Sequence, residues 1–153
     1  MIESVSLVGT VDFAVFDLNG NHVRTIRDNN LVTTAGKNYL VKKIIGSADV
    51  LGSSIEVLAV GDDDSTAAAV GDTELNNEVA RVDIDSVSDS GNTGQFTTTL
   101  PIGVATGTIA EAGLFTSDTT PILLSHIVLS TPFTKASDEF ILVNWRIRIG
   151  SNT

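Results

Sequence analysis

The chain has 153 residues, no cysteine and a formal net charge of −10, with nine lysine or arginine residues against 19 aspartate or glutamate residues. This length allows one domain that buries about 70% of the surface of the unfolded chain, and a mean hydropathy of +0.22 is typical of a folded protein. The charge argues against nucleic acid as a partner, the missing cysteines exclude disulfides and thiolate metal sites, and the short apolar runs argue against a membrane span.

The first quarter of the chain is predicted to be a β-hairpin. Alternate positions of residues 10–17 are apolar, which places three side chains on one face of an extended strand: Val11, Phe13 and Val15. The pair Asn19-Gly20 follows, and such a pair supplies the positive φ angles of a tight hairpin turn. Residues 22–28 are therefore expected to return antiparallel to the first strand.

A short helix is expected after the hairpin. Thr33 or Thr34 can cap its N-terminus, and Gly46 can end it. The apolar residues of this helix are Leu40, Val41, Ile44 and Ile45.

The rest of the chain has the periodicity of β-strands, with turn-rich segments between them. The expected strands are residues 55–60, 79–87, 95–100, 108–115, 122–129 and 140–149. In the last strand the side chains of one face are Ile141, Val143, Trp145, Ile147 and Ile149, and those of the other are Asn144, Arg146 and Arg148. This alternation indicates an antiparallel strand with one buried face.

These elements predict an all-β fold, because one helix cannot supply the crossovers that a parallel sheet requires. We expect a two-layer antiparallel β-sandwich with one short helix and an N-terminal hairpin, forming a single domain over residues 1–153. Residues 1–10 could extend from it as an arm.

Three consecutive carboxylates, Asp62, Asp63 and Asp64, follow the strand that ends at Gly61. Oxygen ligands suit Ca²⁺ or Mg²⁺, but adjacent side chains in an extended segment point to opposite sides, and the spacing of a calcium-binding loop is missing. We interpret residues 61–72 as a solvated loop, with a cation site as the alternative. No cofactor is expected.

Glu78, Arg81 and Glu111 are charged residues inside apolar strand segments. Because a charge in such surroundings needs a partner, we expect Arg81 to pair with Glu111 or Glu78 and to hold the loop ends to the sheet. Replacing Arg81 with Met should then lower stability. A catalytic pair of carboxylates is the alternative interpretation, but no nucleophile or phosphate-binding loop accompanies it.

The remaining candidate residues favour structural roles. His22 and His126 are far apart in the sequence and have no third ligand at metal spacing, so each is expected to be a surface or hydrogen-bonded histidine. Trp145 is expected in the core. Because aromatic residues make up only 5% of the chain, a surface that stacks on sugars is not favoured.

Four stretches resemble a recurrent family of small structural proteins of tailed-bacteriophage virions. They are residues 30–37 (NLVTTAGK), residues 60–81 (VG followed by DTELNNEVAR), residues 109–115 (IAEAGLF) and the closing strand with Trp145. The pattern of the family is similar to this sequence at nearly every fixed position, although Asp63 stands where relatives often have a small residue. The resemblance implies a structural component of the virion and not an enzyme.

Family members of this kind occur on the head and in tail, collar or fibre attachments. Since the sequence ends directly after the expected sandwich, without a fibre shaft, we expect a capsid decoration (cement) protein. It would bind the major capsid protein or other virion proteins as a homo-oligomer, most plausibly a trimer, after assembly in the host cytoplasm. A tail, collar or baseplate subunit that anchors fibres is the first alternative, and a module that binds host glycans is the second.

Overall fold

The computed structural model describes residues 5–151, and this part of the chain forms nine β-strands, one α-helix and one short 3-10 helix. The helical elements are α1 (Thr34–Ile44) and η1 (Ala48–Val50). The strands are β1 (Val5–Phe16), β2 (His22–Val32), β3 (Ile55–Gly61), β4 (Glu78–Asp83), β5 (Ser86–Ser90), β6 (Thr93–Leu100), β7 (Gly107–Thr116), β8 (Leu123–Lys135) and β9 (Phe140–Ser151).

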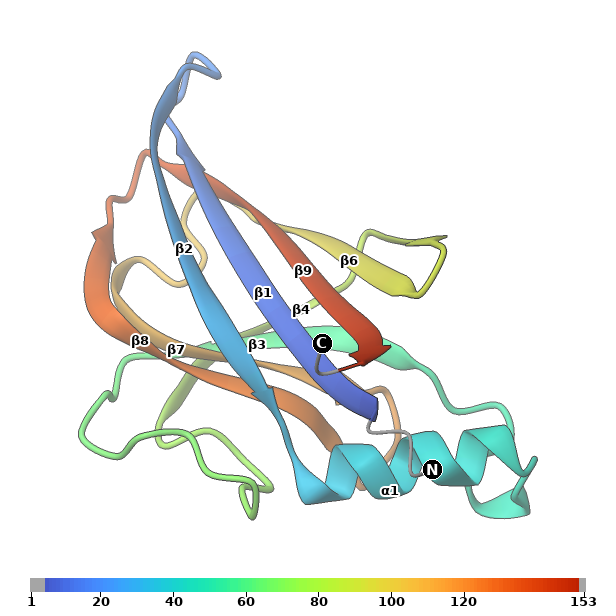
Figure 1. The fold of residues 1–153 in the computed structure, drawn as a ribbon. Coiled ribbons are helices and arrows are strands. Elements are labelled where there is room, and N and C mark those ends of the chain that lie inside the picture. Colours follow the sequence, from blue (N-terminus) through green and yellow to red (C-terminus); the bar gives the residue numbers. More distant parts are fainter. Residues whose placement is uncertain (1–4, 152–153) are drawn as a thin grey trace.

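The nine strands form one antiparallel sheet in the order β4-β3-β7-β8-β2-β1-β9-β6-β5. The sheet curls into a half-barrel, so that β1, β9 and β6 face β3, β7 and β8 (Figure 1). Strand β2 joins the two halves, because most of its length pairs with β1 while Leu31 and Val32 pair with β8. The all-β prediction is confirmed, and the two expected layers are two halves of a single sheet.

The core lies between the two halves of the sheet, as the alternation of apolar residues predicts. Val11 and Phe13 of β1 and Trp145 of β9 have no exposed surface, and they pack in one cluster with Leu58 of β3 and Leu114 of β7. Packing both inner faces against each other removes these side chains from water, which is the main favourable contribution to folding.

The segment predicted as one strand over residues 79–87 is two strands. Consecutive backbone N–H groups change partner at the break: Ile84 donates to Glu56 O at 2.8 Å, and Asp85 donates to Thr97 O at 2.9 Å. The chain therefore leaves β3 and joins β6, and β4 and β5 become the two edges of the sheet. The curl makes this possible, since it brings the two edges close enough for two residues to link them.

Helix α1 begins and ends where its capping residues predict. The side chain of Thr33 accepts a hydrogen bond from the backbone N–H of Gly36 at 2.9 Å, and Gly46 follows the helix with a φ of 67°. The helix lies across one end of the half-barrel, beside β8 (Figure 1). No helix within residues 5–151 is long and apolar enough to cross a membrane.

The prediction that residues 1–10 extend from the domain as an arm is wrong for residues 5–10. Residues 5–10 are part of β1, and they pair with β9 from Val5↔Ser151 to Thr10↔Arg146. Their backbone groups are therefore used inside the sheet. Residues 1–4 lie outside the described part of the chain.

Asp12 of β1 forms ion pairs with both neighbouring strands. Its carboxylate accepts hydrogen bonds from Arg27 of β2 and Arg146 of β9, the latter at 3.1 Å. Burial of Asp12 opposes ionisation, but the hydrogen bonds and charges of the two arginines outweigh it and lower the pKa of Asp12 below its usual value of 3.8. The ionised form thus stabilises the fold above that usual value, and the contribution is lost as the pH falls through the lowered pKa.

We expect Asp12→Asn to lower the free energy of unfolding at pH 7 and to lower it less at pH 3, because part of the stabilisation by the ionised carboxylate is lost below its usual pKa of 3.8. Urea unfolding at both pH values measures this difference. Asp138→Asn, at an exposed position, is the matched control and should show no such contrast. An Asp12→Asn deficit of equal size at both pH values would contradict the assignment.

Candidate functional site

The segment between β3 and β4, residues 62–77, covers the outer face of the sheet, and we call it the acidic loop. Leu75 in this loop is buried in a small apolar cluster with side chains on the outer face: Val57, Ala59, Phe115 and Leu123. Gly113 makes room for this contact, because a Cβ there would lie 2.7 Å from Leu123 Cδ1 and 3.0 Å from Leu75 Cδ2. The loop is therefore a third layer over β3, β7 and β8.

Glu111 of β7 and His126 of β8 form the centre of a buried network under the acidic loop. His126 Nε2 lies 2.9 Å from Glu111 Oε2, and His126 Nδ1 lies 2.7 Å from Asp72 Oδ2. Glu111 also accepts hydrogen bonds from the backbone N–H groups of Asn76 and Asn77, at 2.8 and 2.6 Å. Since Glu111 and His126 have no exposed surface, these buried hydrogen bonds tie the loop to the sheet in a dry environment.

The bonding capacity of the network follows from the types of its groups. Each ring nitrogen of His126 lies within hydrogen-bond distance of a carboxylate oxygen, one from the loop and one from the sheet. Every polar atom of His126 is used within the protein, and Glu111 holds three donors, so the pair has no free position for a substrate.

The end of β3 is shaped to fit this network. A Cβ on Gly61 would lie 2.3 Å from Glu111 Oε1 and 2.4 Å from the backbone oxygen of Asn77. Any other residue at this position would push the carboxylate or the loop away. The glycine before the three aspartates is therefore required by the network behind it and does not mark a ligand-binding turn.

Arg81 pairs with Glu78, one of its two expected partners. Arg81 Nη2 donates to Glu78 Oε1 at 2.7 Å, and Nε donates to Oε2 at 3.1 Å. The guanidinium also lies over the ring of Phe115, 4.5 Å from its centroid. Glu111, the other expected partner, is bonded to His126 and the loop instead. The expected link from Arg81 to Glu111 is thus replaced by buried hydrogen bonds that sequence reasoning missed.

We expect Arg81→Met to lower the free energy of unfolding by only about 1 kcal/mol, because the two side chains of the pair are 36% and 34% exposed and water screens their attraction. Urea unfolding measures the loss. Glu78→Gln is the matched control and should cost less still, since it leaves the arginine on Phe115. A loss of several kcal/mol in either variant would show that the pair is not the exposed contact described here.

The three aspartates do not converge. Asp62 accepts a hydrogen bond from the side chain of Asn77 at 2.6 Å, and Asp63 accepts one from the backbone N–H of Ser65 at 2.8 Å. Hydrogen bonds from the side chain and backbone of Ser65 lower the pKa of Asp63. Asp64 is exposed, and no group of three acidic or histidine residues within residues 5–151 is arranged to hold a metal ion. Asp62 and Asp63 are thus bonded to groups of the loop itself.

The other candidate residues have structural surroundings. His22 is exposed and lies 2.7 Å from Thr25 Oγ1 at the hairpin tip, whereas His126 is fully buried. Trp145 is in the core, with its Nε1 2.6 Å from the side-chain amide of Asn30, which also lies 2.7 Å from Ser125 Oγ. Asn30 satisfies both neighbours when its oxygen faces the indole.

An open cavity of about 530 Å³ lies beside the network, lined by Glu74, Asn76, Glu78, Arg81 and Phe115 among others. Its one cation is already paired with Glu78, and the face of Phe115 is covered by that cation. The ring therefore has no exposed face on which a sugar could stack, and the two guanidinium N–H groups that could bind a carboxylate or phosphate side by side are already bonded to Glu78.

The role of His126 could have been suspected from the sequence. Glu111 and His126 are each the only ionisable residue in a largely apolar stretch, IAEAGLF and ILLSHIVL. Two such residues in strands that are both buried need partners, and each can be the partner of the other. Asp72 and the backbone of Asn76 and Asn77 have no comparable signal, because the conformation of the loop places them beside Glu111 and His126.

No family model, no curated protein and no solved structure matches the chain.

Proposed function

We propose that this chain is a structural protein of a tailed-bacteriophage virion, and specifically a decoration protein that binds the outside of the head. The observation that supports this is where the fold places the four stretches that carry the resemblance. They are distant in sequence, yet they meet around the first half of β8, and their side chains hold the fold together there.

Each stretch has a contact at this place. Thr33, in the first stretch, donates its hydroxyl to Leu123 O at 2.6 Å, and Thr34 donates its backbone N–H to Val70 O at 2.7 Å. The second and third stretches supply the loop and Glu111 of the buried network. The closing strand supplies Trp145, whose indole nitrogen lies beside the side chain of Asn30 in the first stretch. A motif used in this way stabilises a shape, which is what a protein that works by binding its neighbours needs.

The same contacts support a non-enzymatic role. Glu111 and His126 are the buried ionisable pair from which acid–base chemistry would be expected, and they have no exposed surface. Their side chains form hydrogen bonds with the acidic loop and with each other. A general acid or base must reach a proton of its substrate, which this pair cannot do without the loop being removed.

The proposed mechanism is multivalent bridging of capsid subunits. Each copy makes a modest contact with the major capsid protein, and a symmetric oligomer, proposed to be a trimer at local threefold positions, makes several such contacts at once. Release then requires all of them to break together. A shell held across its subunit boundaries resists the pressure of the packaged DNA.

The number of copies per purified virion tests the proposal. Quantitative mass spectrometry with labelled peptides, with the major capsid protein as the internal standard, should count on the order of hundreds of copies, as icosahedral head positions require. A dozen or fewer would place the chain in a tail, collar or baseplate ring and overturn the decoration role. Absence from virions, together with specific hits on a glycan array, would overturn the structural proposal altogether.

A further inference from the structure

The end of helix α1 exposes an apolar surface. Val41, Ile44 and Ile45 are 57, 82 and 71% exposed, and Leu51, after η1, is 81% exposed. We call these four side chains the helix face. A group of large apolar side chains held in water on one element is typical of an interaction surface, because leaving them exposed costs free energy that contact with a partner recovers.

Positive charge surrounds the helix face. Helix α1 carries Lys37, Lys42 and Lys43, three of the nine basic residues of the chain, and it has no acidic residue. Lys42 pairs with Asp49 at 2.9 Å. Within residues 5–151, neither Lys37 nor Lys43 forms an ion pair, and both are exposed. The surface is thus apolar at its centre and basic at its border, in a protein that is otherwise acidic.

The acidic loop has the complementary composition. It contains five carboxylates and no basic residue. Asp62 and Asp64 are exposed, and between them and Asp72 lie small apolar residues, of which Val70 is 50% exposed. The loop is also held firmly by the buried network, so binding to it does not require ordering a mobile segment first.

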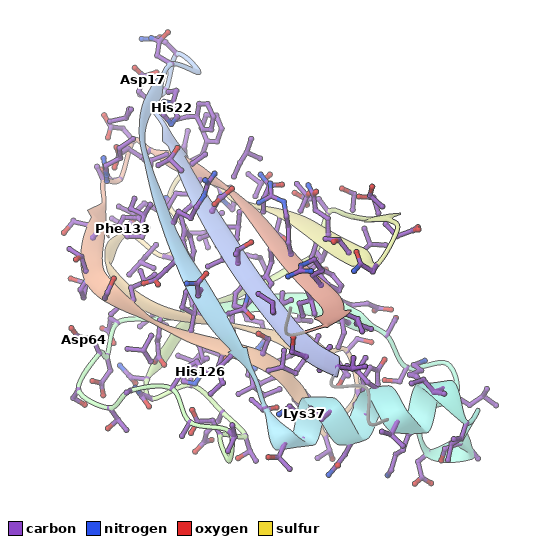
Figure 2. All side chains as sticks on the ribbon, in the orientation of Figure 1. Asp17, His22, Lys37, Asp64, His126 and Phe133 are labelled. Carbon is purple, nitrogen blue, oxygen red and sulfur yellow. The ribbon has the colours of Figure 1, made fainter. Side chains whose placement is uncertain are left out.

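The two surfaces adjoin opposite ends of helix α1. The backbone N–H of Thr34, at the start of α1, donates to Val70 O of the acidic loop, so the two elements adjoin. In Figure 2, Lys37 lies near the bottom of the view and Asp64 at the left edge. The helix face lies at the C-terminal end of α1, away from the acidic loop. One copy therefore presents both halves of a complementary pair without joining them itself.

We propose that the helix face of one copy docks on the acidic loop of a second copy. The apolar side chains supply the centre of the contact, and Lys37 and Lys43 face the carboxylates of the neighbouring loop at its border. Since the contact joins two different surfaces, it closes either as a pair that makes it twice or as a ring. The inference stands on these surfaces alone and does not depend on the proposed place in a virion.

Other partners of a basic apolar helix fit less well. Nucleic acid and an anionic membrane are both negatively charged, and the net charge of −10 repels them at long range. A second copy carries the same net charge, but its acidic loop combines carboxylates with small apolar residues, so one surface can meet both the lysines and the apolar centre of the helix face. The acidic loop of a second copy thus supplies both the carboxylates and the apolar residues that the helix face requires of a partner.

The first test removes the apolar centre. Ile44→Asp should weaken self-association at least about tenfold, since it places a charge where the partner removes water. Sedimentation velocity over a range of concentrations measures the dissociation constant. Leu18→Asp, at a 63% exposed position in the hairpin turn, is the matched control and should associate like the wild type. Both positions are exposed, so thermal unfolding should be unchanged.

The second test reverses the charges at the border. Lys43→Glu and Asp64→Lys should each weaken association about threefold to tenfold, because each puts like charges opposite each other. The double variant Lys43→Glu/Asp64→Lys restores opposite charges in every contact, whatever the symmetry, and should recover most of the wild-type affinity. Neither Lys43 nor Asp64 forms an ion pair in the folded monomer within residues 5–151. Lys43 Nζ lies 5.6 Å from the ring centroid of Tyr39, so thermal unfolding of Lys43→Glu is measured beside its association.

The outcomes separate this inference from the proposed function. A monomeric wild type, or Ile44→Asp and Lys43→Glu variants that associate like the wild type, would overturn the docking contact even if the chain decorates heads. A double variant no better than the single ones would overturn the pairing of helix with loop. Association that follows the expected pattern in a chain missing from virions would support the contact and overturn the virion role.

Discussion

Glu111→Gln should lower the free energy of unfolding by about 3 kcal/mol, the largest effect expected for the exchange of a single atom in this protein. The glutamine has the shape of the glutamate but replaces one acceptor with an NH₂ donor. At the Oε1 position that donor would face the N–H of Asn77, and at the Oε2 position it would face the N–H of Asn76. Either orientation leaves donors opposed in a site without water.

Urea unfolding followed by the fluorescence of the single tryptophan, which is fully buried, measures the loss. Amide hydrogen exchange should also rise at Asn76 and Asn77, because their N–H groups lose their acceptor. Glu78→Gln provides the same chemical change at an exposed carboxylate. A Glu111→Gln variant as stable as Glu78→Gln would contradict the buried network.

Gly36→Ala should lower the free energy of unfolding by about 3 kcal/mol, although alanine is intrinsically better in a helix than glycine by about 1 kcal/mol. A Cβ at this position would lie 2.3 Å from the backbone oxygen of Leu124 and 2.9 Å from its Cα. The strand cannot yield easily, because β8 is paired with β7 and β2 there and also accepts the hydrogen bonds of Thr33. The helix must therefore move away from the sheet.

Gly71→Ala is the matched control. It lies in the acidic loop with no atom within 4 Å of the new Cβ and with no positive φ, so the change should alter stability by no more than about 0.5 kcal/mol. The added methyl group meets the backbone of β8 at position 36 and open space at position 71. If Gly36→Ala were as stable as the wild type, the close packing of α1 on β8 would be wrong.

The two predictions bear on the proposed contact between copies. Glu111 holds the acidic loop and Gly36 sets the position of α1, and these elements carry the two surfaces that are proposed to meet. Variants at either residue should therefore weaken self-association as well as folding, whereas Ile44→Asp should weaken association alone. This separation shows whether a loss of association comes from a displaced surface or from the surface itself.

Local features of the chain were predictable because their causes lie within a few residues. The cap at Thr33 and the alternation around Trp145 depend on backbone angles and on the period of a strand, and the structure confirms both. The hairpin turn is confirmed at Gly20, whose φ is 79°, but Asn19 does not have the positive φ expected of the pair. The break between β4 and β5 was missed, because Ile84 and Asp85 continue the same pattern and only the different strands beside them separate their hydrogen bonds.

The sequence by itself determined that this chain is an antiparallel β protein with one capped helix, since strand period, turn residues and capping residues act locally. Only the tertiary structure decided that Glu111 bonds to His126 and the acidic loop while Arg81 bonds to Glu78. It also decided that the helix leaves Ile44 in water. These outcomes depend on which strands become neighbours, and burial then selects among polar partners that the sequence offers equally.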